Sequence, residues 1–262
     1  MTLPHSHTAP SSAITLYGFP RSWGLPNMSP YCMKVETYLR LAGVEHRRAV
    51  GDLRVAPRGQ MPYALVDDAT IGDSDAIIDA VIRKTGVDLD RGLSAARRAE
   101  HRCLARMLEE STVWVLRYGR FIDSGYEDLR EFMDAILPAG ARLLLRPMIR
   151  RAMRQALQAQ GLGRYSRDEI YAFGRRDLDA VADLLGDRPF FGGDAPTRVD
   201  CTVFAFTASF LCEHARSPMT DHLASRPTLV RYTERMRARA FPELPSWIGA
   251  RVGAPIDEVE AA

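Results

Sequence analysis

The chain has 262 residues, of which 46% are apolar and 26% are charged, and its formal net charge is only +2. That length suits one large domain or two modest ones, each able to bury a sizeable core. The small net charge gives no reason to expect a nucleic-acid partner. No apolar run approaches the roughly 18 residues that cross a bilayer, so a transmembrane helix is not expected.

The two ends and the cysteines indicate the expected compartment. Residues 1–12 lack the apolar stretch of a signal peptide and are predicted to be a disordered tail, and residues 246–262 a C-terminal tail. The cysteines are widely spaced, so a reducing, cytoplasmic compartment is expected rather than a disulfide framework. Arginine far outnumbers lysine in an alanine-rich chain, a bias that favours a bacterial source with a GC-rich genome.

Residues 13–85 alternate between strand and helix signals. The segment 13–19 is β-branched and aromatic and predicts a strand. Ser29 fits the N-cap of a helix, and Gly43 fits the left-handed residue that ends it. Ser74 is predicted to cap a second helix. The predicted order is strand, helix, strand, strand, strand, helix, over 13–19, 29–43, 44–50, two short strands flanking residues 67–68, and 74–84.

Residues 86–92 resemble a linker, and residues 93–245 are helical in their periodicity throughout. An α/β domain followed by an all-α domain is therefore the predicted fold class. Helices are expected over 94–120, 127–160, 166–185, 201–214 and 228–239, with the second interrupted near Pro138 and Pro147.

The stretch Ser29-Pro-Tyr-Cys32 opens the first helix and could carry chemistry. The first turn of a helix has unpaired N–H groups and the positive end of the helix dipole, so an anion is stabilised there. The pKa of Cys32 could be lowered by this position. Alternatively, Ser29 and the free amides could hold the thiolate of a docked ligand. A third interpretation is structural, with Ser29 as a cap and Cys32 as a small buried residue.

Two further stretches lie near helix or strand starts. Pro62 follows Met61 just before a strand, and a cis bond there would leave the Met61 main chain able to pair with an extended peptide. Asp73 and Ser74 stand at another helix N-terminus. Ser74 and nearby amides could receive an α-carboxylate, and Asp73 an ammonium group, although both residues could instead serve only as caps.

In this order and spacing, the three stretches resemble the thioredoxin-like half of glutathione transferases. The resemblance implies that Ser29 activates the glutathione sulfur, that Met61 and Pro62 pair with the tripeptide backbone, and that Asp73 and Ser74 hold its γ-glutamyl end. It covers roughly residues 13–240.

The second half agrees with this resemblance. The stretch "PFFGGDAPTRVD" is similar to the helix-capping motif of the family, with Thr197 as N-cap and Asp200 three residues later. The two residues would have a structural role, because a reciprocal cap satisfies two amides that the helix leaves unpaired.

Within the family, the motifs look most like the branch of failed-axon-connections proteins and metaxins. That branch includes proteins that are not primarily conjugating enzymes, so two functions are carried forward. The first is a homodimeric glutathione transferase that attacks an electrophile with the ionised thiol of glutathione. The second is a non-catalytic, metaxin-like adaptor or ligand-binding protein.

Two departures from the family pattern affect the chemistry. Ser29 stands where a glutaredoxin-like pattern has cysteine, which excludes a dithiol cycle with Cys32. A one-thiol, glutathione-dependent reductase that uses Cys32 stays open. Tyr17, at the end of the first strand, is a rival activator, since some branches of the family use a tyrosine near that position.

Arg142, Arg146, Arg150 and Arg154 recur every four residues, in a segment that has seven arginines and no acidic residue between Ala135 and Arg167. Either the helix packs on its domain with a solvated basic face, the favoured interpretation, or it meets an anionic membrane surface. No metal is predicted, because no histidine or cysteine shows ligand spacing.

Overall fold

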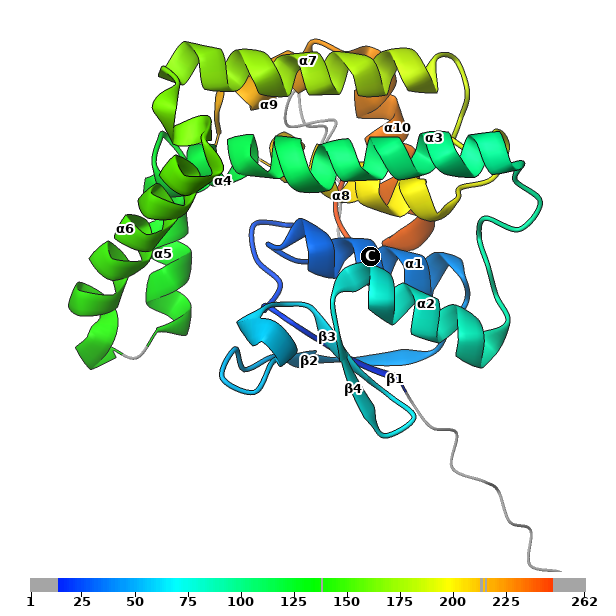
Figure 1. Cartoon of the computed structure of the whole chain (residues 1–262), viewed down its shortest axis with the longest axis horizontal. Coiled ribbons are helices and arrows are strands. Elements are labelled where there is room, and N and C mark those ends of the chain that lie inside the picture. Colours follow the sequence, from blue (N-terminus) through cyan, green and yellow to red (C-terminus); the bar gives the residue numbers. More distant parts are fainter. Residues whose placement is uncertain (1–13, 138, 213, 215, 247–262) are drawn as a thin grey trace, which may run out of the picture.

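The computed structural model of the chain describes residues 14–246, except residues 138, 213 and 215 (Figure 1). The two predicted tails lie outside these residues, apart from residue 246. The described part consists of a four-stranded sheet with two helices on one face, followed by a larger helical domain. This is the fold class that the sequence predicts.

The sheet has the strand order β2-β1-β3-β4. Its strands are β1 (Ile14–Gly18), β2 (His46–Val50), β3 (Tyr63–Val66) and β4 (Ala69–Gly72). β2 runs parallel to β1, whereas β3 is antiparallel to both β1 and β4. The tight turn between β3 and β4 consists of Asp67 and Asp68, both at positive φ (48° and 63°), and Asp tolerates that conformation better than most residues.

Both helices of this domain, α1 (Pro30–Leu41) and α2 (Ser74–Thr85), cover the same face of the sheet. The short 3₁₀ turn η1 (Pro57–Gly59) precedes β3. Side chains alternate between the two faces of a strand, so Leu16 and Ala64 point inward, where they form one cluster with Val35, Ile77 and Val81. These apolar residues hold α1 and α2 at fixed positions against the sheet.

The helical domain is built around α8 (Arg198–Leu211), in which every residue after Arg198 is buried. The surrounding elements are α3 (Ala95–Arg106), the π-helical segment η2 (Met107–Thr112), α4 (Val113–Phe121), α5 (Tyr126–Ile136), α6 (Arg142–Gln160), α7 (Arg167–Leu185), α9 (Pro218–Ala224) and α10 (Pro227–Ala240), with the 3₁₀ turns η3 (Ala139–Ala141) and η4 (Leu162–Arg164). Helix α1 packs against α8 and joins the two domains. None of the helices in the described ranges is both long and apolar enough to cross a membrane.

The structure corrects the sequence-based elements at three places. The helix expected over 94–120 contains the π segment η2, and the short helix α9 was not predicted. Pro147 lies inside α6 and does not interrupt it. Pro147 occupies the second turn and is exposed, so only one early backbone hydrogen bond is lost there.

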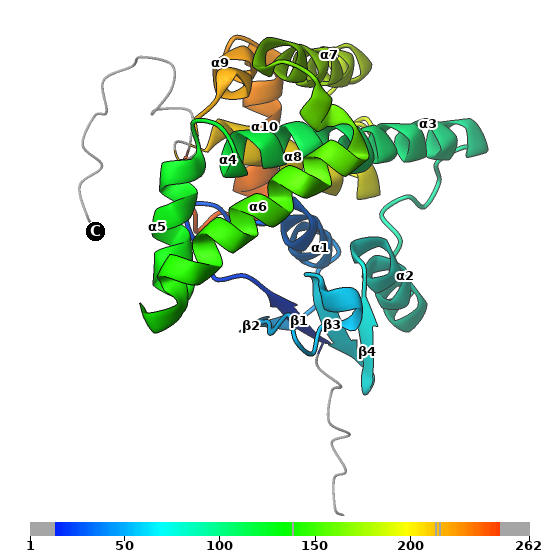
Figure 2. The same cartoon turned by 60° about the vertical axis from the view of Figure 1, so that its left-hand side comes forward.

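Helices α5 and α6 form a hairpin that extends from the helical domain beside the α/β domain (Figure 2). Leu157 is the only buried residue of α6 among those that the structure describes. Helix α6 is therefore attached mainly through half-buried side chains, whereas α5 contributes the buried Leu129 and Met133.

Candidate functional site

The register of the sheet brings the three predicted stretches to the same end of the strands, which is called this edge of the sheet below. Tyr17 pairs with Tyr63, and Tyr63 pairs with Gly72, so β1 ends where β3 begins and where β4 ends. Met61 directly precedes this start of β3, and Asp73 directly follows this end of β4. Helix α1 returns antiparallel to β1, and its first turn lies at the same edge. Ser29, Met61 and Asp73 therefore border one corner of the α/β domain, here called the Ser29 corner.

Ser29 is the N-cap of α1, as predicted. Its Oγ accepts a hydrogen bond from the Cys32 amide, with an N···O distance of 3.4 Å. Its own amide donates to Oδ1 of Asn27 at 3.0 Å, and Asn27 in turn donates to the Phe19 carbonyl at 2.8 Å. Asn27 is buried and fixes the turn that delivers Ser29. Asn27 was not among the predicted site residues, although Asn two residues before a cap is a turn signal.

Cys32 lies on the buried side of α1. Its side chain is 1% exposed, and a Cβ added to Gly18 would stand 3.3 Å from its sulfur. Burial raises the pKa of Cys32 to about 12, and the contact with Ser29 only partly offsets this effect. The expected lowering of the Cys32 pKa by the helix terminus is therefore wrong, because desolvation of the thiolate outweighs the helix dipole.

Tyr17 lies on the opposite face of the sheet from α1 and α2. It follows Leu16, which points into the core, so its side chain points outward. Its ring stacks on that of Tyr63, with centroids 4.5 Å apart and an interplanar angle of 9°. This packing directs Tyr17 away from Ser29.

The bond between Met61 and Pro62 is cis. Met61 is half-buried, and no hydrogen bond within the described part of the chain engages its main-chain N–H or C=O. The main chain of Met61 is therefore available to an extended ligand at the corner.

The structure corrects the predicted cap of α2. Asp73 is the N-cap: Oδ1 accepts hydrogen bonds from the amides of Asp75 and Ala76, both at 3.0 Å. Ser74 is the first helical residue and is buried. Two of the amides that were expected to be free are thus engaged by Asp73, which stands at a positive φ of 82°.

The long loop before Ser29 is attached to the helical domain. Arg21 lies 3.4 Å from the buried Glu36 and 3.0 Å from Glu243. The ring of Trp23 stacks on that of His214, with centroids 5.7 Å apart. These contacts hold the loop against the helices that follow α7, so its conformation is defined by the second domain.

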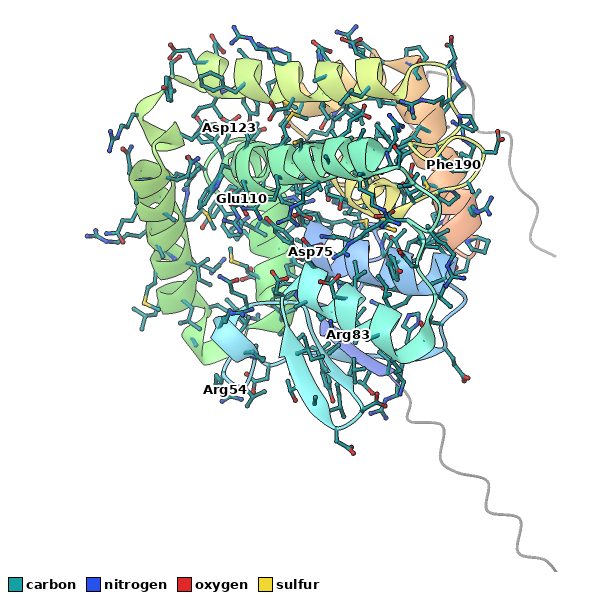
Figure 3. The ribbon with its side chains drawn as sticks, turned by 45° about the vertical axis from the view of Figure 1, so that its right-hand side comes forward. Arg54, Asp75, Arg83, Glu110, Asp123 and Phe190 are labelled. Carbon is teal, nitrogen blue, oxygen red and sulfur yellow. The ribbon has the colours of Figure 1, made fainter. Side chains whose placement is uncertain are left out.

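A buried network of charges joins the domains next to the corner. Lys34 of α1 contacts Asp75 at 2.5 Å and Glu109 of η2 at 2.6 Å, and Arg198 also contacts Asp75, at 2.9 Å. Asp75 stands at the start of α2, where the two domains meet (Figure 3). A cavity of about 220 Å³ opens along this seam, and Lys34, Asp75 and Arg198 are among its lining residues. No sequence pattern predicts this network, because its members lie far apart in the chain.

The predicted capping motif of α8 and the prediction on metal binding can also be compared with the structure. Thr197 is the N-cap of α8 and Asp200 the third helical residue, as predicted. Asp200 accepts hydrogen bonds from the Thr197 amide at 2.7 Å and hydroxyl at 2.8 Å, and from the Phe191 amide at 2.9 Å. Within the described residues, no group of three or more His, Cys, Asp or Glu side chains could hold a metal ion.

Three arginines of the predicted basic stripe hold α6 in place. Arg142 donates to the Leu137 carbonyl, Arg146 contacts Asp134 at 3.2 Å, and Arg150 donates to the Ile122 carbonyl. These contacts support the packed interpretation for that side of the helix.

Comparison with known proteins finds a matching protein family for each half of the chain. A family described as "Glutathione S-transferase N-terminal domain" matches residues 30–126, and one described as "Glutathione S-transferase, C-terminal domain" matches residues 174–236.

Individual relatives match over most of the chain. Isoprene-epoxide–glutathione S-transferase of Rhodococcus sp. (strain AD45) is 31% identical over 233 residues, which cover 86% of this chain and 98% of the relative. Failed axon connections of Drosophila melanogaster is 32% identical over 253 residues, covering 91% of this chain. The chain spans only 60% of that relative's length. Metaxin-1 of Macaca fascicularis is 25% identical, covering 94% of this chain and 79% of the relative.

Solved structures share the fold. The glutathione transferase GSTFuA3 of Phanerochaete chrysosporium superposes with a TM-score of 0.62 at 15% identity, and the superposition covers 87% of this chain and 97% of that one.

Proposed function

Because the chain belongs to the glutathione S-transferase family, we propose that it binds glutathione at the corner and ionises its thiol beside Ser29 for attack on an electrophile. The observation that carries the proposal is the register of the sheet, which brings Ser29, Met61 and Asp73 to one edge. A tripeptide that spans this edge would meet a hydroxyl, an unengaged main chain and a carboxylate.

Each of the three positions offers a different contact to glutathione. The unengaged main chain of Met61 would pair with the peptide backbone of the ligand. The Asp73 carboxylate would receive the ammonium group of the γ-glutamyl end. Asp73 already accepts two amide hydrogen bonds through Oδ1. Oδ2 is the oxygen that we assign to the ligand, since an ionised carboxylate has about four acceptor positions.

Ser29 would stabilise the ionised sulfur. Its Oγ accepts from the Cys32 amide, and its hydroxyl can turn from the Cys32 thiol, the neighbour that it contacts, toward a ligand. A hydroxyl has one hydrogen to donate, so Ser29 can donate it to a thiolate. The positive end of α1 adds to this stabilisation. The proposed nucleophile is therefore the sulfur of glutathione, since the thiol of Cys32 is buried and protonated near neutral pH.

We propose an epoxide as the class of electrophile, because the Rhodococcus relative is named for isoprene epoxide. The thiolate would form a sulfur–carbon bond as a ring carbon–oxygen bond breaks. The resulting alkoxide would take a proton from water, which completes the hydroxyalkyl conjugate. Positioning and ionisation of the thiol are the two contributions that this step requires of the protein.

Isothermal titration calorimetry with glutathione tests the binding step. We expect saturable binding to the natural protein and a roughly tenfold weaker affinity for Asp73→Ala. Tyr17→Phe is the matched control, because Tyr17 lies on the other face of the sheet and its phenol should not contact the ligand. Absence of any heat of binding in the folded protein would contradict the proposal.

A second candidate function is a non-catalytic adaptor at a membrane surface. The observation that favours it is on α6, where Leu143, Leu144 and Met148 are 83%, 72% and 55% exposed. Flotation with anionic vesicles tests it. Binding that is lost in Leu143→Ser/Leu144→Ser, together with no conjugation of an epoxide, would favour the adaptor over the transferase.

We also propose a homodimer, in keeping with the resemblance to the family. Sedimentation velocity at micromolar concentration tests it. A single species at the mass of one chain, 29.3 kDa, would contradict a dimer without affecting the proposed chemistry.

A further inference from the structure

Arg120 of α4 is a buried cation without an acidic partner. Its side chain is 6% exposed, yet none of the described acidic side chains forms an ion pair with it. Its Nη1 donates to the Met28 carbonyl at 2.6 Å and its Nη2 to the Ser209 carbonyl at 3.4 Å, while Nε has no partner. Its hydrogen-bond acceptors are thus two backbone carbonyls and no carboxylate.

Other buried cations of this protein are neutralised. Lys34 lies between Asp75 and Glu109, and Arg237 contacts Glu234. Burial of an unpaired charge is costly, and burial lowers the pKa of Arg120 to about 10. That pKa still leaves the guanidinium protonated near neutral pH, so its charge is not balanced within the described part of the protein.

The charge lies close to the Ser29 corner. Met28, whose carbonyl receives the 2.6 Å hydrogen bond, is the residue before Ser29. Covalent geometry therefore places the guanidinium within about 8 Å of the Ser29 hydroxyl. Cζ of Arg120 lies over the ring of Trp23, 5.4 Å from its centroid, and Trp23 belongs to the loop that leads to Ser29.

We propose that Arg120 is a positioning residue that holds the Met28–Ser29 turn and supplies a fixed positive charge for an anion, the ionised sulfur, beside Ser29. The identity of that anion as glutathione rests on the proposed function. The balancing negative charge would then arrive with the ligand. At a separation of about 8 Å and an effective dielectric constant of about 20, one charge changes the pKa of a thiol by about 1.5.

Few other ionisable groups face this region from the packed elements. Cys212, at the end of α8, is a titratable group whose charge raises the pKa of Arg120. His214 stacks on Trp23 and lies 3.9 Å from Asp128. Cys32 lies in the first turn of α1, where the charge of Glu36 raises its pKa and that of Arg48 lowers it. These groups are unchanged in every variant below, so differences between variants report the charge at position 120.

The test places a reporter thiol at the corner, so that it does not depend on glutathione binding. Ser29→Cys is made in a Cys32→Ala/Cys103→Ser background, which removes the adjacent thiol and the exposed one. The rate of alkylation by iodoacetamide against pH then gives the pKa of the introduced thiol. Arg120→Gln removes the charge but keeps a donor for the Met28 carbonyl, and Arg120→Lys keeps the charge. Arg216→Met, on an exposed side chain, is the control for net charge.

We expect the pKa of the introduced thiol to rise by about 1.5 in Arg120→Gln and to change little in Arg120→Lys and Arg216→Met. Equal pKa values in Arg120→Gln and its parent would overturn the proposal and leave Arg120 with a role in folding only. If Arg120→Gln does not fold, the pKa of the introduced thiol is compared between Arg120→Lys and its parent at low and at high salt. A fixed buried charge predicts a thiol pKa that changes little with salt. A strongly salt-dependent thiol pKa would overturn the proposal. Calorimetry with glutathione on the natural protein separately decides the proposed function.

Discussion

Nζ of Lys34 lies 2.6 Å from Oε1 of Glu109, across the boundary between the two domains. Both side chains are buried, and Asp75 contacts the same ammonium group. Glu109 belongs to the π-helical segment η2, and its carbonyl accepts a hydrogen bond from the Tyr31 hydroxyl at 2.7 Å. Irregular helical turns of this kind are often found at functional positions. Here the segment anchors α1, and with it Ser29, to the helical domain.

Lys34→Met should destabilise the protein by about 3–5 kcal/mol, because it leaves Glu109 buried without its counter-charge. The double variant Lys34→Met/Glu109→Met should lose less than the sum of the two single variants. Guanidinium unfolding at pH 7 measures the free energies. Additive losses would show that the two groups do not stabilise one another.

Asp75 should make the free energy of unfolding of the protein depend on pH in the acidic range. Burial alone would raise the pKa of Asp75, but the charges of Lys34 and Arg198 outweigh it and hold the pKa at about 2. A carboxylate whose pKa is lower in the folded state stabilises the protein above its unfolded pKa, near 4, and this contribution is lost as the pH falls through 2. We expect Asp75→Asn to lose about 2 kcal/mol at pH 6 and almost nothing at pH 2.

Urea unfolding between pH 2 and pH 6 measures this difference. Asp168→Asn is the control, since that side chain is 95% exposed. A constant difference in unfolding free energy between Asp75→Asn and the natural protein across this range would contradict the assigned pKa.

The four cysteines should differ strongly in reactivity. Cys103 is exposed, whereas Cys32, Cys201 and Cys212 are buried. Because the pKa of Cys32 is about 12, iodoacetamide at pH 8 should modify Cys103 at least tenfold faster than Cys32. Mass spectrometry of peptides from the native protein measures both rates. Fast modification of Cys32 would instead favour the hypothesis of a one-thiol, glutathione-dependent reductase.

Ser29→Ala should reduce kcat/KM for epoxide conjugation about 10- to 100-fold, because it removes the donor that we assign to the thiolate. Folding should change little, although the cap of α1 loses a hydrogen bond worth about 1 kcal/mol. Initial rates with a model epoxide and circular dichroism measure the two effects. An unchanged kcat/KM would remove Ser29 from the mechanism.

Local sequence signals predicted much of the α/β domain. Ser29 and Gly43 mark the limits of α1 because capping and left-handed turns depend on a few adjacent residues. The same signals were ambiguous where two capping residues adjoin. Asp73 caps α2 in place of Ser74, since the longer carboxylate side chain reaches two amides at once.

The parts that were not predictable depend on contacts between distant segments. The direction of the Cys32 side chain is set by the close approach of Gly18, and its burial reverses the pKa expected from the helix terminus. The pairing of Lys34 with Glu109 joins residues that lie 75 positions apart. No local pattern encodes which segment of the second domain will cover a given turn of the first.

The ultraviolet absorbance of the glutathione thiolate, followed as the protein is titrated with glutathione at pH 7, tests the central claim most directly. Free thiols with a pKa near 8.5 are mostly protonated at this pH. We predict a saturable thiolate absorbance in the natural protein that is largely lost in Ser29→Ala. Saturable binding without thiolate absorbance, or no binding by the folded protein, would contradict the claim that this corner holds and ionises glutathione.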